Sequence, residues 1–547
     1  MDALANFIVK QKKLIIFLYI ILSLLAFIGS RFVEVNYDLS LYLPQSLNSI
    51  EGKNILEEEF GIGGTAYVLI KDESFNEIEN LVKDIDTIEG IKEVIWLGTV
   101  EDIFKPEDFM DENIKKEFLS ENSNLIQIHF SNPNDSLETV EGVEEIQNIL
   151  GEKGVVGGPA AVSKDLQYIT SKEVIYYSLV AFVIISIILF LSLESFIEPI
   201  LFFIAIGVAI ILNMGTNIVF DNISYTTHSV AAIIQLAVSM DYSIFLLHRY
   251  MEEKENHRDN NQAMIVAIEK TFNSVLSSSM TTVAGFLALI VMKYTIGRDI
   301  GLVLAKGVLF SLISVMTLLP VLILLFDKAI EKYKHKVFLP SFNKLANFII
   351  RRKYVLLIIG IIIAIPSYLA QSNVKYYYAN EKVLPETSDS NMAIREINQL
   401  FSNKNQLALL LPKGDKLKEN QLTEELKNIE GVGDVKGMYS MVDIVIPETF
   451  IPEDVKENFQ SKNYSLININ LNLPMEGDIT KDSLNQIKTK VSNYYDKWYL
   501  TGESAIYSDL QETTAKDFRN VSILSIVLIT SIILIAFKSI SIPIILV

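Results

Sequence analysis

The sequence predicts a helical membrane bundle that carries two α+β lobes and arose by tandem duplication. Three observations support this fold class. The chain contains runs of roughly 20 apolar residues, the length needed to cross the hydrocarbon core of a bilayer. Two long polar stretches with an acidic excess separate these runs, and short motifs of the first part of the chain recur in the second.

The recurring motifs keep a nearly constant spacing. Leu43-Pro44 returns as Leu384-Pro385, 341 residues later, and Asp165-Leu166-Gln167 returns as Asp509-Leu510-Gln511, 344 residues later. This spacing indicates that a whole module was duplicated, since it far exceeds the period of a solenoid repeat. The first copy runs on to Phe326, so the second copy is expected to run to about residue 670. We therefore expect the 547-residue sequence to lack most of a second membrane half.

The apolar runs predict eight membrane spans and the start of a ninth at Ile542. The first run follows three lysines but no small-residue cleavage site follows it, so it is interpreted as a retained helix and not as a signal peptide. The predicted spans are Leu14–Ser30, Val174–Leu193, Pro199–Val219, Val230–Leu247, Val275–Met292, Ile300–Phe326, Tyr354–Leu369 and Val521–Phe537.

These runs divide the chain into seven predicted segments. The amino terminus and first span occupy residues 1–31, and the first lobe occupies 32–173. Spans 2 to 6 occupy 174–326, and a connecting segment covers 327–353. The remaining segments are span 7 at 354–371, the second lobe at 372–517, and span 8 with the start of span 9 at 518–547.

The distribution of charge predicts the orientation. Residues 327–353 carry eight basic and two acidic side chains, so this connection and the amino terminus are expected to be cytoplasmic. Both lobes then lie outside the cytoplasmic membrane. The first lobe has 30 acidic and 10 basic residues, and the second has 23 and 16. Such acidic surfaces argue against a nucleic-acid partner. The chain has no cysteine, which excludes disulfides.

Each lobe has the pattern strand, helix, strand, strand, helix, strand, which suits a split βαβ, ferredoxin-like fold. The assignment rests on alternating apolar residues in the strands and helical spacing between them. In the first lobe the elements are Ala66–Ile70, Phe75–Ile85, Ile91–Leu97, Leu125–Phe130, Leu137–Leu150 and Val155-Val156. In the second they are Leu407–Leu411, Leu422–Ile429, Val435–Tyr439, Leu466–Leu471, Ser483–Tyr495 and Trp498–Leu500.

Asp241 is the strongest candidate for a functional residue. It lies about 16 Å from the outer end of its span, near the middle of the membrane, where a carboxylate costs about 2.5–3.5 kcal/mol. Protonation removes much of this cost, so a carboxyl group there can carry a proton. No other ionisable residue is expected at that depth. The alternative is a structural carboxylic acid that hydrogen-bonds a neighbouring helix.

Polar neighbours could assist Asp241. Tyr242 adjoins it, and Ser278, Thr281 and Thr282 lie at a similar depth in the next span, where their hydroxyl groups could orient the carboxyl group or a water molecule. Helix packing by small hydroxyl residues explains these three equally well. The sequence contains no phosphate-binding loop, no hydrolase motif and no cluster of metal-ligating residues, so neither an enzyme nor a cofactor is predicted.

Three segments together resemble one family. Met240 to Tyr250 resembles the fourth-span signature of the MMPL branch of the resistance–nodulation–division (RND) superfamily, Ser279 to Phe286 resembles its fifth-span signature, and Gly301 to Pro320 its sixth-span pattern. The resemblance implies porter-like lobes outside the membrane. It also implies that Asp241 and Tyr242 form half of a proton relay, completed by an Asp-Tyr pair in span 10 near residue 585.

The resemblance implies a proton-driven exporter of lipids or other hydrophobic or amphiphilic molecules, with the proton gradient in place of a cofactor. The expected partners are such a substrate, the membrane lipids and the second membrane half that supplies the other relay pair. The oligomeric state is not predicted. Spans 2 to 6 also resemble a sterol-sensing arrangement, so a lipid sensor is an alternative, as is a protein-export accessory of the same superfamily.

Overall fold

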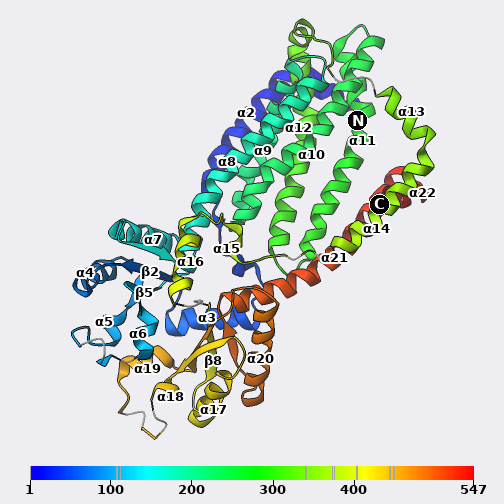
Figure 1. The fold of residues 1–547 in the computed structure, drawn as a ribbon. Helices are drawn as coiled ribbons and strands as arrows, with labels where there is room; N and C mark the ends of the chain where they lie inside the picture. The colour runs from blue at the N-terminus through cyan, green and yellow to red at the C-terminus, as the bar shows by residue number, and fades with distance from the viewer. Residues whose placement is uncertain are drawn as a thin grey trace.

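A computed structural model describes residues 2–105, 109–110, 112–338, 342–371, 374, 376–401, 405–442, 445–446 and 450–547. Its helices form a long bundle, and two lobes lie together at one end of that bundle, hereafter the lobe end (Figure 1). The amino terminus lies toward the opposite end. The described residues include eight helices that are long and apolar enough to cross a membrane, which confirms a helical membrane protein with additional sheet structure.

The eight spanning helices match the predicted apolar runs, but three of them begin 15 or more residues earlier. One of these, α11, starts at Asn260 and not at Val275. Helix α8 starts at Pro159 and α21 at Glu503, inside the predicted lobes, so each runs unbroken from a lobe into the membrane region. The first turns of these helices mix charged and polar residues with apolar ones, so hydropathy alone missed them. The helices are α2 (Lys12–Gly29), α8 (Pro159–Ser192), α9 (Ile197–Gly215), α10 (Tyr225–Asn256), α11 (Asn260–Leu287), α12 (Ile296–Lys332), α14 (Lys353–Gln371) and α21 (Glu503–Phe537).

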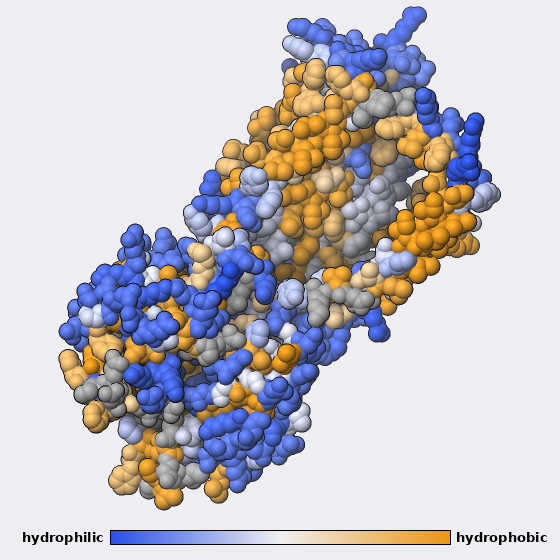
Figure 2. All heavy atoms as spheres, viewed as in Figure 1, coloured by the Kyte–Doolittle hydropathy of each residue, from blue (hydrophilic) through white to orange (hydrophobic). Residues whose placement is uncertain are grey.

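Five of these helices share one apolar core. Helices α2, α9, α10, α11 and α12 pack together, and α12 is the most enclosed of them. Close contact between α2 and α9 depends on Gly215, because a Cβ atom there would lie 1.9 Å from the backbone oxygen of Ala26. Helix α14 has no buried residue, and it stands away from the bundle with α21. Figure 2 shows the open space between this pair and the bundle.

Both lobes contain an antiparallel sheet with the same order of strands. The first sheet runs β3-β5-β2-β6 and the second β9-β10-β8-β11, so the first strand in sequence lies in the interior of each sheet. The predicted order of elements is confirmed. The elements are β2 (Thr65–Lys71), α4 (Phe75–Asp86), β3 (Ile91–Ile95), β5 (Ser123–Phe130), α7 (Leu137–Leu150) and β6 (Gly154–Gly157), then β8 (Asn405–Pro412), α17 (Lys416–Leu426), β9 (Val432–Gly437), β10 (Tyr464–Leu471), α20 (Asp478–Tyr494) and β11 (Tyr499–Thr501).

The two lobes exchange a helix, which the sequence did not predict. Helix α3 (Asn48–Phe60) packs through Phe60 on the second sheet, while α16 (Asp389–Phe401) packs through Ile397 and Phe401 on the first. A hydrogen bond at the start of each exchanged helix also ties it to the partner lobe's connection to the membrane region. The backbone N–H of Ser390 donates to Asp165 (2.9 Å), and the hydroxyl of Ser49 donates to Asp509 (2.6 Å). The lobes therefore form one interlocked unit.

This unit is also fixed to the bundle. A short parallel pair joins β1 (Val35–Asn36), which leads into the first lobe, to β7 (Ile223–Ser224), which leads into α10. The N–H of Tyr294 donates to the buried carboxylate of Asp517 in α21 (2.8 Å). The shorter elements are α1 (Asp2–Lys10), η1 (Ser30–Phe32), η2 (Leu39–Tyr42), α5 (Leu97–Val100), α6 (Glu112–Phe118), β4 (Leu119–Ser120), η4 (Thr216–Val219), η5 (Ala288–Val291), α13 (Asn343–Arg351), α15 (Asn380–Val383), α18 (Met438–Met441), α19 (Glu453–Phe459) and α22 (Ser541–Leu546).

Candidate functional site

Asp241 and Tyr242 lie on different faces of α10. Asp241 is exposed, on a stripe that also includes Ala237, Phe245 and His248. Successive helical residues are about 100° apart, and Tyr242 accordingly points into the bundle, where it is 2% exposed. Its hydroxyl group has no hydrogen-bond partner among the described residues. The carboxyl group is thus presented at the surface of the bundle and the phenol is enclosed within it.

The predicted supporting hydroxyl groups bind their own helix. Ser278 is exposed on α11, and its carbonyl oxygen accepts hydrogen bonds from the hydroxyls of Thr281 (2.7 Å) and Thr282 (3.2 Å). No hydrogen bond between these residues and Asp241 is present in the described structure. The hydroxyl groups therefore lie on the helix next to α10 without being joined to the carboxyl group.

A polar cluster inside the bundle was missed by the sequence analysis. Lys306 of α12 lies within a predicted span, nearer the lobe end than Asp241 and therefore at a different depth. Its ammonium group donates to the carbonyl oxygen of Asn213 (3.0 Å) and to the side chains of Thr216 (2.9 Å) and Asn217 (2.7 Å). A lysine within an apolar run was the available indication.

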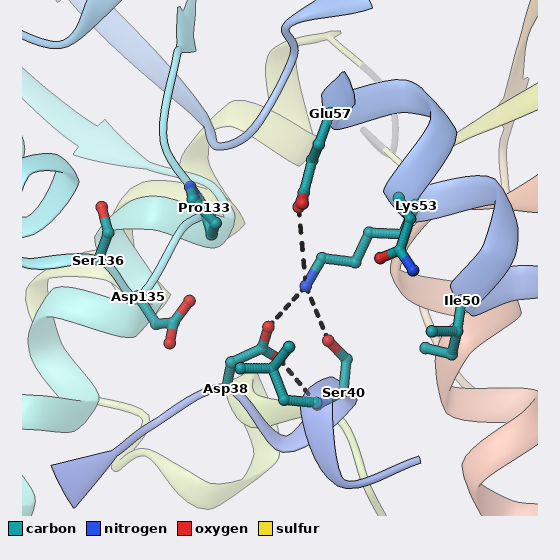
Figure 3. Close-up of a pocket in the computed structure, with 10 residues that line it drawn as sticks. Asp38, Ser40, Ile50, Lys53, Glu57, Pro133, Asp135 and Ser136 are labelled. Atoms are coloured by element: carbon teal, nitrogen blue, oxygen red, sulfur yellow. Dashed lines mark hydrogen bonds and ion pairs between the residues drawn. The ribbon is translucent and has the colours of Figure 1, made fainter. Parts of the chain in front are cut away.

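A second candidate site lies where the first lobe meets the membrane connection. A cavity of about 150 Å³ is lined by charged side chains from three elements (Figure 3). The ammonium group of Lys53 donates to Asp38 (2.5 Å) and to the hydroxyl of Ser40 (2.8 Å), and it lies 3.8 Å from Glu57. Asp135 points toward the same space, and no hydrogen bond or ion pair joins it to a basic side chain in the described structure. The cavity thus holds three carboxyl groups and one ammonium group; this set is hereafter the junction cluster.

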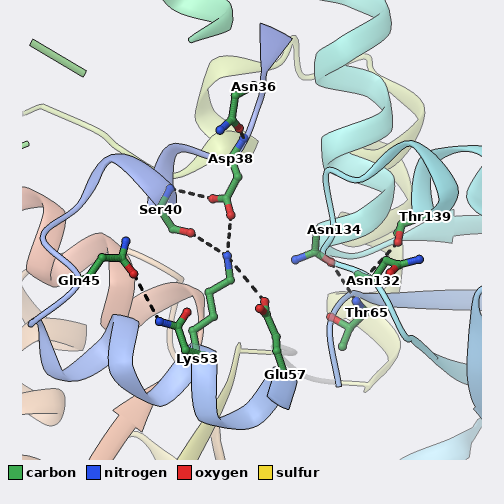
Figure 4. Close-up of polar contacts among 11 residues, drawn as sticks. Asn36, Asp38, Ser40, Gln45, Lys53, Glu57, Thr65, Asn132, Asn134 and Thr139 are labelled. Atoms are coloured by element: carbon green, nitrogen blue, oxygen red, sulfur yellow. Dashed lines mark hydrogen bonds and ion pairs between the residues drawn. The ribbon is translucent and has the colours of Figure 1, made fainter. Parts of the chain in front are cut away.

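The junction cluster connects parts of the molecule that belong to different units. Asp38 and Ser40 follow β1, Lys53 and Glu57 belong to α3, and Asp135 precedes α7 of the first lobe. The loop before Asp135 is fixed to the first sheet, since the N–H of Thr65 donates to Asn134 (2.9 Å; Figure 4). Helix α3 packs on the second sheet. A change of charge in the junction cluster would therefore affect contacts among the first lobe, the second lobe and the segment that follows the first span.

The pKa values of the three carboxyl groups in the junction cluster are shifted in different directions. Burial, followed by the nearby charge of Asp38, raises the pKa of Asp135 to about 6. Burial also acts on Asp38, but the charge and hydrogen bonds of Lys53 and Ser40 outweigh it and hold the pKa of Asp38 below its usual value. Burial raises the pKa of Glu57 despite the charge of Lys53. Asp135 is therefore the group whose charge changes near pH 6.

Replacing Asp135 with asparagine is expected to stabilise the lobes at pH 7 by roughly 1–2 kcal/mol, allowing for solvent screening. The folded pKa lies above the unfolded one, so the wild-type protein loses stability as pH rises from about 4 to about 6, and this loss should vanish in Asp135→Asn. Chemical unfolding at a series of pH values, followed by tryptophan fluorescence, measures both effects. Glu141→Gln, an exposed change in α7, is the control. Equal pH profiles for wild type and Asp135→Asn would contradict this assignment.

A second cavity, of about 170 Å³, lies between the lobes. Its lining includes Tyr67 and Pro159 of the first lobe and Pro474 of the second, with Ile394 and Ile397 of α16 between them; Lys382 and Glu476 also line it. The residues 341 positions after Asp38, Lys53 and Glu57 are Ala379, Ile394 and Asn398, and all three line this second cavity. At these three positions the first cavity has charged residues and the second has neutral ones. In the part of the chain that the structure describes, no group of three His, Cys, Asp or Glu side chains could hold a metal ion.

Comparison with known proteins places these features in a family. The model of the MMPL family matches residues 71–352 and 382–547, which include most of the bundle and all strands of the two lobe sheets except β2, of which only Lys71 is matched. The chain belongs to the MMPL family. This finding confirms the resemblance to the MMPL family and points to a membrane transporter rather than an enzyme.

Several curated relatives are named as membrane proteins or transport proteins. A membrane protein of Methanocaldococcus jannaschii, MJ1562, is 28% identical over 191 residues, which cover 35% of this chain and 49% of the relative. The probable transport protein MmpL2 of Mycobacterium tuberculosis is 22% identical over 343 residues, 58% of this chain and 35% of the relative. MmpL4 of Mycobacterium leprae, also named as a probable transport protein, is 21% identical over 289 residues, which cover 50% of this chain and 30% of the relative. The matched part of this MMPL chain spans half or less of each relative's length.

Proposed function

We propose that this MMPL chain belongs to a proton-driven exporter of lipids or other hydrophobic and amphiphilic molecules in the cytoplasmic membrane. In this proposal the amino terminus is cytoplasmic, and the two ferredoxin-like lobes, related by tandem duplication, lie outside. The observation that carries the proposal is the carboxyl group of Asp241, which lies within an apolar span and faces the open side of the bundle. An ionisable group in such a position is a functional site by default.

The exposed stripe of α10 that carries Asp241 leaves room for a second set of helices. Helices α14 and α21 stand apart from α10, and the stripe of α10 that carries Asp241 has no covering helix among the described residues. A second bundle, with its own Asp-Tyr pair, placed against this stripe would enclose Asp241 between the two bundles. Burial favours the protonated carboxyl group, so proton binding and release would change the contact between the two bundles.

The lobes offer a route by which such a change could reach a substrate. Helices α8 and α21 are continuous over 34 and 35 residues, so movement of their membrane segments is transmitted to the lobes. Beside Pro159, at the start of α8, lies the cavity between the lobes, whose apolar and charged lining could receive part of an amphiphilic guest. Moving one charge through 100 mV supplies about 2.3 kcal/mol, whereas reversing a 1:99 equilibrium needs about 5.5 kcal/mol. The pH gradient or a second proton must therefore contribute.

Transport in vesicles tests this function. The protein, expressed from its complete gene, is reconstituted with a fluorescent lipid, and its movement is followed with an imposed proton gradient and again after an uncoupler is added. We expect the uncoupler to abolish net transport. A lipid sensor of the sterol-sensing type would bind the lipid equally well in both conditions and move none, and this result would refute the proposal. A protein-export accessory would instead form crosslinks between its lobes and a polypeptide.

A further inference from the structure

The second lobe contains a buried carboxyl group at a position where the first lobe is apolar. Glu419 is one of the buried residues of α17, and it is 3% exposed. Its carboxyl oxygen Oε1 has no hydrogen-bond partner among the described residues. The neighbouring hydroxyl group of Ser465, on β10, is also buried and lacks a partner in the described structure. Burying a carboxylate without a hydrogen bond or a nearby positive charge is costly, so such a group favours its neutral form.

The positions 341 residues earlier show what the first lobe has instead. Glu419 corresponds to Ile78 of α4, which is fully buried in the apolar core of the first lobe. Gly437, which precedes α18, corresponds to Trp96, which precedes α5. The backbone N–H of each of these two residues donates to a hydroxyl group three residues later, at 2.8 Å and 3.0 Å, so the two positions are structurally equivalent.

The carboxyl group faces the place where β9 meets α18. A Cβ atom at Gly437 would lie 3.6 Å from Oε1 of Glu419, so a side chain as large as that of Trp96 at position 437 would meet the carboxyl group. Glu419 therefore lies where α17, β9 and α18 come together, and these helices are in the part of the second lobe that is far from the bundle (Figure 1). Just beyond this point, Met438 and Tyr439 of α18 form a small apolar cluster with Ile451.

No ion pair to Glu419 occurs among the described residues. Lys418 pairs with Asp415 (3.4 Å), and Lys490 pairs with Glu425 (3.1 Å). Burial raises the pKa of Glu419 to about 7, and the hydroxyl group of Ser465 does not offset this effect. The charged or titratable side chains on the surrounding elements are Asp415, Lys416, Lys418 and Glu425 on α17, Asp434 and Lys436 on β9, Tyr439 on α18, Lys490 and Tyr494 on α20, and Tyr495 after α20.

We propose that Glu419 is a pH-sensitive switch that holds α17 and the start of α18 on the second sheet when it is neutral and releases them when it ionises. The neutral acid has an O–H group that can donate to the hydroxyl oxygen of Ser465, which gives both groups a partner. When the acid loses this proton to water, a carboxylate remains in an apolar core. The cost of burying this charge shifts the equilibrium toward an open arrangement in which water reaches Glu419.

The switch is closed at low pH and opens as the pH rises. The pKa of Glu419 in the folded lobe, about 7, lies above that of glutamate in an unfolded chain, about 4.3. The closed state is therefore fully favoured below about pH 4 and loses stability until the pH passes about 7. Asp135 titrates in the same direction but belongs to the first lobe, so a measurement local to α17 separates the two groups. If the lobes lie outside, as proposed above, the switch responds to the pH of that compartment.

Hydrogen exchange of the backbone amides of α17 tests the switch. The complete protein is studied in lipid nanodiscs between pH 5 and pH 8, and each rate is corrected for the intrinsic pH dependence of amide exchange. Glu419→Gln keeps the shape of the neutral acid but cannot ionise, and Glu419→Ile introduces the residue type found at position 78. Glu424→Gln is the control, because Glu424 is exposed on the same helix and pairs with Lys427 at 2.7 Å.

We expect the protection of α17 in the wild type to fall at least about 30-fold between pH 5 and pH 8. Protection should change less than about threefold in Glu419→Gln and Glu419→Ile, while Glu424→Gln should behave like the wild type. Wild-type protection that does not change with pH would overturn the proposal, as would equal pH dependence in the wild type and Glu419→Gln. The comparison with Glu419→Gln decides even if Glu419→Ile does not fold. No transport is measured, so the outcome is independent of the proposed function.

Discussion

Replacing Asp241 with asparagine is expected to reduce proton-coupled transport at least about 100-fold, the lower end of what a positioned proton-transfer group contributes. The amide has nearly the same shape as the protonated carboxyl group but cannot release a proton. The variant should therefore fold, insert and bind lipid normally while it stays in one state of the cycle. Lipid transport in vesicles with an imposed gradient, at equal amounts of folded protein, measures the effect.

Glu252→Gln is the matched control for this variant. Glu252 lies on the same exposed stripe of α10, three turns beyond Asp241, and pairs with Arg249 at 2.7 Å. The same carboxylate-to-amide change there should leave transport within about twofold of wild type, because an exposed ion pair contributes little. Equal transport by wild type and Asp241→Asn would remove Asp241 from the mechanism.

Replacing Lys53 with methionine is expected to destabilise the lobes by about 3–5 kcal/mol, the cost of breaking a mostly buried ion pair from one side. The substitution removes the only ammonium group in the junction cluster and leaves Asp38, Glu57 and Asp135 facing one another. Thermal unfolding should shift downward by roughly 10 °C. The chain's two tryptophans, Trp96 in the first lobe and Trp498 in the second, allow fluorescence to report the lobes separately from the bundle.

The second lobe region supplies the control for the Lys53 variant. Ala379, Ile394 and Asn398 occupy the positions that correspond to Asp38, Lys53 and Glu57. The triple variant Asp38→Ala, Lys53→Ile, Glu57→Asn should recover most of the lost stability, because it removes two of the three carboxyl groups around the former ammonium group and leaves only Asp135. If Lys53→Met unfolds at the wild-type temperature, the junction cluster is a solvated surface pair and has no role in joining the lobes.

Local sequence patterns were sufficient to predict most elements, because hydropathy and periodicity depend on neighbouring residues alone. The strands from Ala66 and Leu407 and the helix at Leu137 appear in the structure within a few residues of their predicted limits. The exchange of α3 and α16 could not be predicted in this way. An amphipathic helix shows that it must cover a sheet, but its sequence does not say which of two similar sheets it covers.

The candidate sites likewise include residues that the sequence identified and residues that only the fold revealed. Asp241 was found from sequence because a carboxylate in an apolar run is conspicuous, yet its direction relative to Tyr242 required the packing of α10. Lys53 and Asp38 were missed because charged residues in an acidic lobe usually face water, and only the fold encloses them.

Infrared difference spectroscopy provides the most direct test that Asp241 gains and loses a proton during transport. The carbonyl stretch of a protonated carboxyl group is recorded in reconstituted membranes as the pH is stepped, for the wild type and for Asp241→Asn. The account predicts a carboxylic-acid band that rises on acidification in the wild type and is missing from the variant's difference spectrum. Identical difference spectra for the two proteins would contradict the account, since Asp241 would then keep a single charge state throughout.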